Sequence, residues 1–231
     1  MVYLDDKSNN AYGRYFSKEY VNAFSDIGIE KYGDKLRNLP WEPVKAQHGK
    51  GHITRSSCWF ANDPCSCQYK YGNKPWDANP TPEWIIGIGK VLCDLLELSH
   101  DAINSCNANM YTCDNEDLYW HSDGEPLFRA NDAFDRNVFI ISISFGCTRG
   151  FHVRKKFDHK KVKLWLHDGD VATMEQAFQD KYDHCVPKRN IGTDYPQGSP
   201  SSSSSSGLQS LRYNLTFRLI KRHSKKCPLH S

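Results

Sequence analysis

Two residues near the middle of the chain, His121 and Asp123, have a spacing that suits a shared metal ion. Residues two positions apart on a β-strand project their side chains from the same face. A 2-His-1-carboxylate site for Fe(II) combines such a pair with one distant histidine and keeps coordination positions open for a cosubstrate and oxygen. The segment HSDGE, residues 121–125, therefore predicts an iron site, provided that a second histidine reaches it.

The second histidine has to come from later in the chain. We predict His184, because it follows a Gly-Asp turn at residues 169–170 and a strand that would return toward the first pair. A proline that follows His184 closely could end its element. His167, which precedes the turn, is the second choice, and the other histidines of this region are His152 and His159.

The stretch RYNLTFR, residues 212–218, places two arginines on one face of a predicted strand. Side chains alternate along a strand, so this one has a polar face and an apolar face. An amphipathic strand with its arginines in water is the simplest interpretation. The heptad alone does not decide where its polar face points. That face carries Arg212, Asn214, Thr216 and Arg218, and the apolar face carries Tyr213, Leu215 and Phe217.

Several motifs, taken in order, resemble the AlkB family of iron(II)- and 2-oxoglutarate-dependent dioxygenases. They are an N-x-Y pair at Asn109 and Tyr111, HSDGE, the segment GDVATMEQAFQDKYDHCVPK (169–188) and RYNLTFR. Upstream, LPWEP (39–43), ITRSSCWFAND (53–63) and the YKYG and NKPW segments (69–76) resemble the family's nucleotide-recognition region. The similarity covers residues 39–220. It implies a mainly β fold with helical buttresses and a cupin-like double-stranded β-helix, or jelly-roll, core.

The resemblance implies a role for each matching residue. Arg212 would pair with the distal carboxylate of 2-oxoglutarate, and Arg218 would lie near the keto-acid end. The polar face of RYNLTFR then points into the barrel, where a dicarboxylate and a metal give the guanidinium groups partners. The implied iron ligands are His121, Asp123 and His184; Asn109, Tyr111 and Asn214 would help to bind 2-oxoglutarate; and the catalytic group is the three ligands with Arg218.

The activity that the resemblance implies is oxidative removal of methyl groups from N-alkylated bases, of the 1-methyladenine and 3-methylcytosine type, in DNA or RNA. Fe(II), 2-oxoglutarate and O2 would be required. The same chemistry on another substrate is an alternative, such as 5-methylcytosine, a tRNA or a protein side chain, because a fold does not fix a substrate. An inactive nucleic-acid-binding module would be expected to lack a ligand or an arginine, whereas this sequence retains all of them.

Candidate substrate residues follow from the same resemblance. A base flipped out of its stack is held against an aromatic ring, for which we predict Trp59; a core position is the alternative for this residue. Glu125 could accept a hydrogen bond from an exocyclic amine or favour a cationic base, or it could be a solvated loop residue. Tyr69 and Tyr71 are expected at the mouth of the pocket.

A basic segment, FGCTRGFHVRKK (145–156), matches positions beside the family's site. Arg149 and Arg154 would lie near the substrate, and Lys155 and Lys156 would offer contacts to phosphates. The alternative is the solvated end of a hairpin.

The elements that must position these residues can be read from hydrophobic periodicity. A short helix is expected over residues 17–27, with Ser17 as its N-cap, and a stronger one after Thr81 and Pro82. Strands are expected over residues 138–145, 162–166, 171–174 and 211–220. Early helices followed by short strands predict an antiparallel sandwich or barrel with helical buttresses.

Composition and predicted secondary structure divide the chain into three parts of one integrated domain. We expect an N-terminal helical extension (1–38), a nucleotide-recognition region with a supporting helix (39–105) and a jelly-roll catalytic core (106–231). A Ser-, Gly- and Pro-rich segment at 190–210 predicts a flexible surface loop. The basic tail that starts at Lys221 is either a solvated terminus or an arm that contacts phosphates.

Composition limits the remaining options. A chain of 231 residues with a formal charge of +3 fits one domain, and any anionic partner must be met by a local patch. Nine cysteines without a regular framework, and a start that lacks an apolar signal core, predict an intracellular protein of the nucleus or cytoplasm that is not secreted. Cys65 and Cys67 are expected to be free thiols rather than metal ligands, since they have no CxxC partner. We expect a monomer that binds nucleic acid and no membrane.

Overall fold

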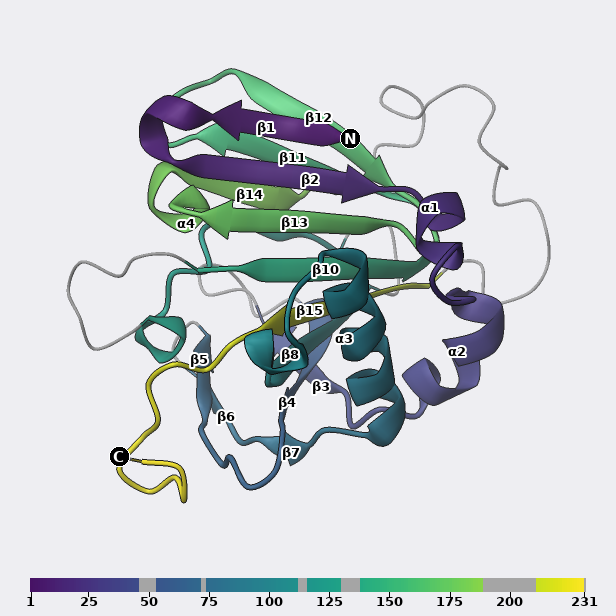
Figure 1. Ribbon diagram of the computed structural model, residues 1–231, viewed down its shortest axis with the longest axis vertical. Coiled ribbons are helices and arrows are strands. Elements are labelled where there is room, and N and C mark those ends of the chain that lie inside the picture. Colours follow the sequence, from purple (N-terminus) through teal and green to yellow (C-terminus); the bar gives the residue numbers. More distant parts are fainter. Residues whose placement is uncertain (46–52, 72–73, 112–115, 130–137, 189–210, 231) are drawn as a thin grey trace.

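The computed structural model describes residues 1–45, 53–71, 74–111, 116–129, 138–188 and 211–230 (Figure 1). The predicted loop at 190–210 lies outside this described part. Within it, no helix has the length and hydrophobicity needed to cross a membrane.

Two antiparallel sheets form the core of the protein. The larger sheet has the order β1-β2-β13-β10-β15-β8-β4-β3, with β7 beside β4, and the smaller one has the order β12-β11-β14-β9. The larger sheet consists of β1 (Val2–Asp6), β2 (Ala11–Phe16), β13 (Val171–Gln176), β10 (Ile140–Gly146), β15 (Arg212–Arg218), β8 (Ser105–Tyr111), β4 (Ile53–Ala61), β3 (Glu42–Lys45) and β7 (Asn79–Pro80). The smaller sheet consists of β12 (Lys161–Leu166), β11 (Arg149–Lys155), β14 (Tyr182–Val186) and β9 (Leu118–His121). This arrangement confirms the predicted jelly-roll class.

Helices cover the outer face of the larger sheet. In Figure 1, α3 (Glu83–Leu95) lies in front of β15 and β8, and α2 (Ile29–Arg37) lies to its right. The apolar residues of RYNLTFR face them, in a core cluster with Ile85, Ile88 and Leu92 of α3. The polar residues of the strand therefore occupy the opposite, inner face, because successive side chains alternate. All seven residues of β15 are buried.

Strand register gathers the polar side chains of three neighbouring strands on that inner face. Asn214 of β15 lies opposite Ser144 of β10 and Asn109 of β8. Thr216 lies opposite Ser142 and Asn107 in the same way. Isoleucines alternate with these serines in β10 and point toward the helices. The sheet therefore has one apolar face and one polar face, and the polar face lines the interior between the sheets.

The predicted strands are confirmed as β10, β12, β13 and β15, and the second predicted helix as α3. The first helix is shorter than predicted: α1 spans Lys18–Asn22, and the chain then turns where the Asn22 side chain accepts a hydrogen bond from the Ile27 amide at 3.1 Å. The sequence analysis did not predict α2.

The prediction of a helical extension over residues 1–38 is wrong for its first half. β1 and β2 pair with each other, and β2 also pairs with β13, so this segment widens the larger sheet. Tyr3 fixes the strands to that sheet, because its hydroxyl donates to the Thr173 carbonyl at 2.6 Å. These strands are short and lie at the end of the sheet. A strand can form there with only weak alternation of apolar and polar residues, so its sequence gives little signal.

Three smaller elements complete the part of the molecule near the site. β5 (Tyr69–Tyr71) and β6 (Lys74–Trp76) form a separate hairpin after β4. The short helix α4 (Phe178–Lys181) joins β13 to β14, and a 3-10 turn, η3 (Pro126–Phe128), follows the HSDGE segment. The 3-10 turns η1 (Lys7–Asn9) and η2 (His100–Ala102) lie outside this region of the chain.

Candidate active site

Adjacent strands of the smaller sheet bring the two predicted histidines together. His121 ends β9, and His184 lies directly opposite it on β14, with ring centroids 4.2 Å apart. Asp123 completes the group: its Oδ1 lies 3.4 Å from His121 Nε2, and its Oδ2 lies 3.7 Å from His184 Nε2. The three ligand atoms lie within 4.8 Å of one another. His167 is elsewhere, with its Nδ1 2.9 Å from the Thr148 hydroxyl.

The contacts of His121 and the burial of His184 suit both imidazoles to metal binding. His121 Nδ1 is 2.7 Å from the Tyr119 carbonyl, which can only accept, so this nitrogen carries the proton and Nε2 is left as the ligand atom. His184 is buried, and burial together with the neighbouring His121 and Arg218 lowers its pKa to about 3. It is therefore neutral at physiological pH, as a metal ligand has to be.

Asp123 is held as a carboxylate. Burial alone would raise its pKa, but Arg218 and the two histidines lower the pKa well below its usual range. The Arg218 Nη2 donates to Oδ2 at 2.6 Å. The backbone amide of Asp123 donates to Gln179 Oε1 at 2.8 Å, so α4 fixes the position of this residue. Two imidazoles and one carboxylate are the donor set that suits Fe(II).

The other arginine of RYNLTFR lies in the same cavity and has unused donors. Arg212 is 1% exposed; its Nη2 donates to the Ser144 hydroxyl at 3.0 Å, and its guanidinium lies 5.2 Å from the centre of the Tyr111 ring. Among the described residues, Nε and Nη1 have no hydrogen-bond partner. Burial lowers the pKa of Arg212, and the nearby Arg149 adds to this effect. A buried cation with two open donors fits an anionic ligand such as a carboxylate.

Comparison with known proteins agrees with this geometry. A model of the 2OG-Fe(II) oxygenase superfamily matches residues 29–218. The chain is 29% identical to alpha-ketoglutarate-dependent dioxygenase alkB homolog 3 of Bos taurus, over 80% of this chain and 58% of the relative, and 26% identical to the DNA oxidative demethylase ALKBH2 of Arabidopsis thaliana, over 80% and 59%. The chain belongs to the AlkB family of this superfamily.

A solved structure supports the fold, and the relatives show how much of their own length this chain matches. The solved structure of OsALKBH1 matches with a TM-score of 0.56 and 17% identity, over 89% of this chain and 97% of that one, which supports the fold. The human alkB homolog 3 is 29% identical over 75% of this chain and 54% of the relative. The chain thus spans a little over half the length of the curated relatives it matches. Membership of the superfamily implies Fe(II) and 2-oxoglutarate as cofactors, and the donor set and the open Arg212 nitrogens fit both.

The other residues that the AlkB resemblance assigns to 2-oxoglutarate line the same cavity as Arg212. Their polar groups are largely used within the protein. Asn214 Nδ2 donates to the Ser142 hydroxyl at 2.8 Å and to the Ile143 carbonyl at 2.9 Å. Asn109 Oδ1 accepts from Arg55 Nε at 2.8 Å and from the Ser57 hydroxyl at 2.6 Å. These asparagines therefore fix the wall of the cavity, whose lining includes Arg55, Asn109, Tyr111, Asn214, Arg218 and the three candidate iron ligands.

Of the predicted substrate residues, Tyr69 lines the cavity, and Glu125 contacts Tyr69 and Arg218. The Tyr69 hydroxyl donates to Glu125 Oε1 at 2.8 Å and accepts from Arg218 Nη1 at 3.3 Å. Burial and the charge of Asp123 raise the pKa of Glu125. Its second oxygen, Oε2, has no hydrogen-bond partner among the described residues.

Trp59 and Tyr71 are placed differently. Trp59 is 1% exposed, does not line the cavity, and stacks on Tyr69 with ring centroids 4.9 Å apart. It thus supports the ring that does line the cavity, which is Tyr69. Tyr71 ends β5, but its side chain lies outside the described part of the chain.

The basic segment is buried where it begins and solvated where it ends, at Lys155, whose contact with phosphates stays a prediction. Arg149 is buried, and its Nη2 donates to the carbonyls of Glu116 and Pro187 at 2.6 and 2.8 Å, near Tyr111 at the Arg212 end of the cavity. Lys156 donates to the Gln179 carbonyl at 2.9 Å. Arg149 therefore lies at the Arg212 end of the cavity, and its contact with the substrate stays a prediction.

The sequence analysis did not predict three residues that position the site. Gln179 binds the Asp123 amide, Ser144 binds Arg212, and Arg55 binds Asn109. The alternation of serines in residues 140–146 was a signal for Ser144, because it matches the period of the polar face of β15. Gln179 is 1% exposed and lies on a four-residue helix. A helix this short has no periodicity that could identify a buried polar residue from the sequence.

Proposed function

We propose that this chain is an Fe(II)- and 2-oxoglutarate-dependent dioxygenase that removes methyl groups from N-alkylated bases, of the 1-methyladenine and 3-methylcytosine type, in DNA or RNA. The observation that carries the proposal is the pairing, in one cavity, of a two-histidine, one-carboxylate donor set with a buried arginine whose Nε and Nη1 lack a partner in the described structure. The names of the relatives, an alpha-ketoglutarate-dependent dioxygenase and a DNA oxidative demethylase, support the reaction and the class of substrate.

The proposed roles of the residues follow from their contacts. His121, Asp123 and His184 would hold the iron, and Arg212 would bind the distal carboxylate of 2-oxoglutarate. When bound, iron and 2-oxoglutarate supply the oxidant that hydroxylates the alkyl carbon, which is then lost as an aldehyde. Arg218 keeps Asp123 ionised and oriented through its 2.6 Å hydrogen bond. The buried walls exclude water from the reaction.

The proposed base-binding surface consists of Tyr69 and Glu125. Tyr69 presents an aromatic ring to the cavity, held in place by Trp59 behind it and by Glu125 at its hydroxyl. The Glu125 Oε2, which has no hydrogen-bond partner among the described residues, could accept a hydrogen bond from an exocyclic amine. In this proposal Trp59 acts through Tyr69 rather than on the base. We further propose that the protein acts as a monomer where its nucleic-acid substrates are found, in the nucleus or the cytoplasm.

A direct assay tests this function. The protein is incubated with Fe(II), 2-oxoglutarate and ascorbate, together with oligonucleotides that carry 1-methyladenine, 3-methylcytosine or 5-methylcytosine, each as DNA and as RNA. Mass spectrometry then measures loss of the methyl group, and succinate is measured in parallel. We expect demethylation of the N-methylated bases and no reaction with 5-methylcytosine. Succinate without any demethylated product would reject the substrate, and no succinate from any mixture would reject the oxygenase.

A further inference from the structure

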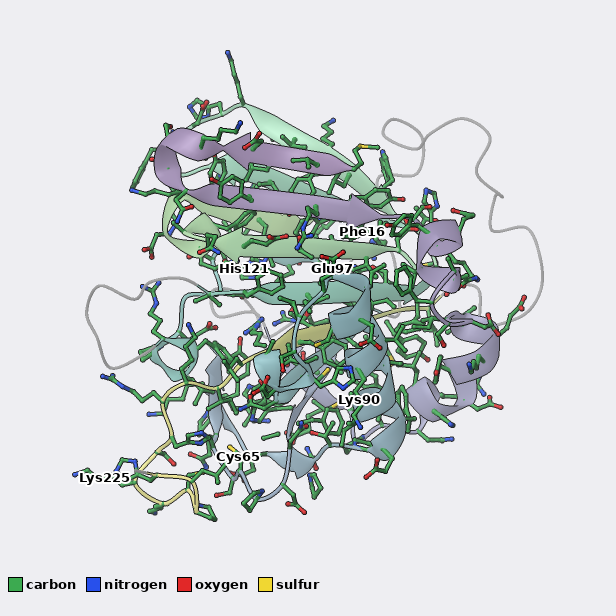
Figure 2. The ribbon with its side chains drawn as sticks, viewed as in Figure 1. Phe16, Cys65, Lys90, Glu97, His121 and Lys225 are labelled. Atoms are coloured by element: carbon green, nitrogen blue, oxygen red, sulfur yellow. The ribbon has the colours of Figure 1, made fainter. Side chains whose placement is uncertain are left out.

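A second cluster of metal-ligating side chains lies apart from the candidate iron site. Cys65 and Cys67 belong to the loop between β4 and β5, and His223 and Cys227 belong to the C-terminal tail that follows β15. Cys65 lies in the corner of the molecule that the tail with Lys225 also occupies (Figure 2). The four ligand atoms lie within 4.8 Å of one another, although the two pairs are more than 150 positions apart in sequence.

The distances between these atoms are those of a tetrahedral metal site. His223 Nδ1 lies 3.6 Å from the Sγ atoms of Cys65 and Cys67 and 3.4 Å from that of Cys227. The Sγ atoms of Cys227 and Cys65 are 3.8 Å apart. Zinc bonds of about 2.3 Å to sulfur and about 2.0–2.1 Å to nitrogen give tetrahedral edges of about 3.8 Å between sulfurs and about 3.6 Å between sulfur and nitrogen. A disulfide would require about 2.05 Å.

The surroundings of the cluster favour thiolates. The Ser224 amide donates to Cys67 Sγ at 3.3 Å. The backbone amides of Leu229 and Ser66 donate hydrogen bonds to the Cys227 sulfur. Amide hydrogen bonds of this kind orient metal-bound thiolates and stabilise their charge. A divalent metal binds the deprotonated form of a thiol, so the three cysteines would hold it as thiolates.

We propose that Cys65, Cys67, His223 and Cys227 bind one structural Zn(II) ion. Three thiolates and one imidazole are a common zinc ligand set, and four protein ligands leave no position for water or substrate, which is the character of a structural rather than a catalytic site. The three cysteines are buried, with exposures of 7%, 0% and 5% in chain order, so the ion would be shielded from solvent.

The consequence of such a site is a cross-link between the tail and the wall of the active site. The Cys67 carbonyl accepts a 2.9 Å hydrogen bond from Trp59 Nε1, and Trp59 stacks on Tyr69 in the cavity. On the other side of the cluster, the amides of Lys221 and Arg222 both donate to the Leu127 carbonyl, at 3.0 and 3.2 Å. Zinc would therefore hold the basic tail against the loop that positions Tyr69.

Metal content of the full chain tests the proposal without reference to catalysis. We expect one zinc per chain by inductively coupled plasma mass spectrometry of the purified protein, in a His121→Ala background that weakens the candidate iron site. Zinc should be lost in Cys227→Ser and in His223→Ala. It should remain in His230→Ala, a matched control, because His230 lies in the same tail, its ring contacts the His223 carbonyl, and it is not one of the four clustered side chains.

Cobalt provides an independent measurement on folded protein. Chelation of zinc followed by addition of Co(II) should produce the charge-transfer band of cobalt thiolates and the d–d bands of tetrahedral Co(II) in the His121→Ala chain. His223→Cys keeps four ligands, so it should retain the metal with a shifted spectrum, whereas His223→Ala should not form this chromophore. Chelation should also lower the melting temperature of the chain but not that of the Cys227→Ser variant.

The outcomes separate this proposal from the oxygenase proposal. A purified chain without zinc that also takes up no Co(II) after reconstitution would overturn the structural site, whatever the demethylation assay shows. So would undiminished zinc in both Cys227→Ser and His223→Ala. A zinc-containing chain without demethylase activity would leave this site established and reject only the function.

Discussion

Arg218 and Asp123 form a buried ion pair in which the Arg218 Nη2 lies 2.6 Å from the Asp123 Oδ2. The two side chains are 2% and 6% exposed. Six residues earlier on the same strand, Arg212 is equally buried, but its Nε and Nη1 have no partner among the described residues. One strand thus supplies a cation that is already neutralised by a candidate iron ligand and a second cation that is not. The difference between the two arginines leads to opposite predictions for their removal.

Replacement of Arg218 by methionine should destabilise the metal-free protein. The change leaves the Asp123 carboxylate buried without its cation, and breaking a buried pair in this way costs about 3–5 kcal/mol. Urea unfolding should show this loss in the absence of metal, and addition of Fe(II) or Mn(II) should recover part of it. An unfolding free energy equal to that of the unmodified chain would contradict the role assigned to this pair.

Replacement of Arg212 by methionine should weaken 2-oxoglutarate binding without destabilising the protein. The variant loses charged hydrogen bonds to the ligand, worth about 1.5–3 kcal/mol, which corresponds to about a 10- to 150-fold rise in Kd. It also removes a buried cation that has no anion in the described structure, so the unfolding free energy should not fall. Isothermal titration with 2-oxoglutarate in the presence of Mn(II) measures the first effect, and urea unfolding measures the second. Unchanged affinity would remove Arg212 from the 2-oxoglutarate site.

The candidate iron ligands and the two arginines could be found in the sequence because each lies in a short motif with fixed spacing, whereas the inward direction of the arginines followed only from the family resemblance. The H-x-D pair lies at the end of one strand, and RYNLTFR alternates over seven residues, so each motif is local. The pairing of His184 with His121 is not local. The turn at residues 169–170 suggested it, and the resemblance to a known family then supported it.

What could not be predicted depends on contacts between distant segments. Cys65 and Cys67 have no CxxC partner in sequence, and only the fold of the C-terminal tail brings His223 and Cys227 to them. Trp59 was expected against the base, but a strand residue can face either way, and here its indole donates into the loop that contains Cys67. The first two strands were missed because a short strand at a sheet's end needs only a pairing partner, which β13 provides.

Gln179 should be a positioning residue for the iron site. Its Oε1 accepts the Asp123 amide at 2.8 Å, so Gln179→Leu should free the segment that contains Asp123 and weaken Fe(II) binding by about 10- to 100-fold. Gln179→Glu keeps an acceptor at the same place and should recover part of the affinity. The d–d spectrum of Co(II) bound to the iron site, in a Cys227→Ser background, should shift in the leucine variant. An unaltered spectrum and affinity would reduce Gln179 to a packing role.

Tyr69 should affect the base and not 2-oxoglutarate. Tyr69→Phe keeps the aromatic ring but removes the hydroxyl that donates to Glu125 and accepts from Arg218. We expect the KM for a methylated oligonucleotide to rise by about 10-fold, the cost of one hydrogen bond to a charged group, with little change in the KM for 2-oxoglutarate. Steady-state kinetics with each substrate varied in turn measure both values. Equal effects on the two constants would indicate a general disturbance of the cavity rather than a role at the base.

Replacement of Gly146 or Gly87 by alanine should change the free energy of unfolding in opposite directions. The Gly146 variant tests the strand pairing that positions Arg212, and the Gly87 variant is its comparison. Gly146 ends β10 opposite Arg212, has a φ of +80°, and a Cβ there would lie 2.3 Å from the Leu211 carbonyl oxygen. Gly146→Ala should therefore lower the unfolding free energy by more than the ~1–2 kcal/mol of left-handed backbone strain, because the strands must also move apart. Gly87 lies exposed within α3, where a Cβ has no neighbour within 4 Å, so Gly87→Ala should raise the unfolding free energy by about 0.5–1 kcal/mol. Urea unfolding of both variants gives the two values, and a weaker 2-oxoglutarate affinity in Gly146→Ala alone would show that the β10–β15 pairing positions the Arg212 guanidinium.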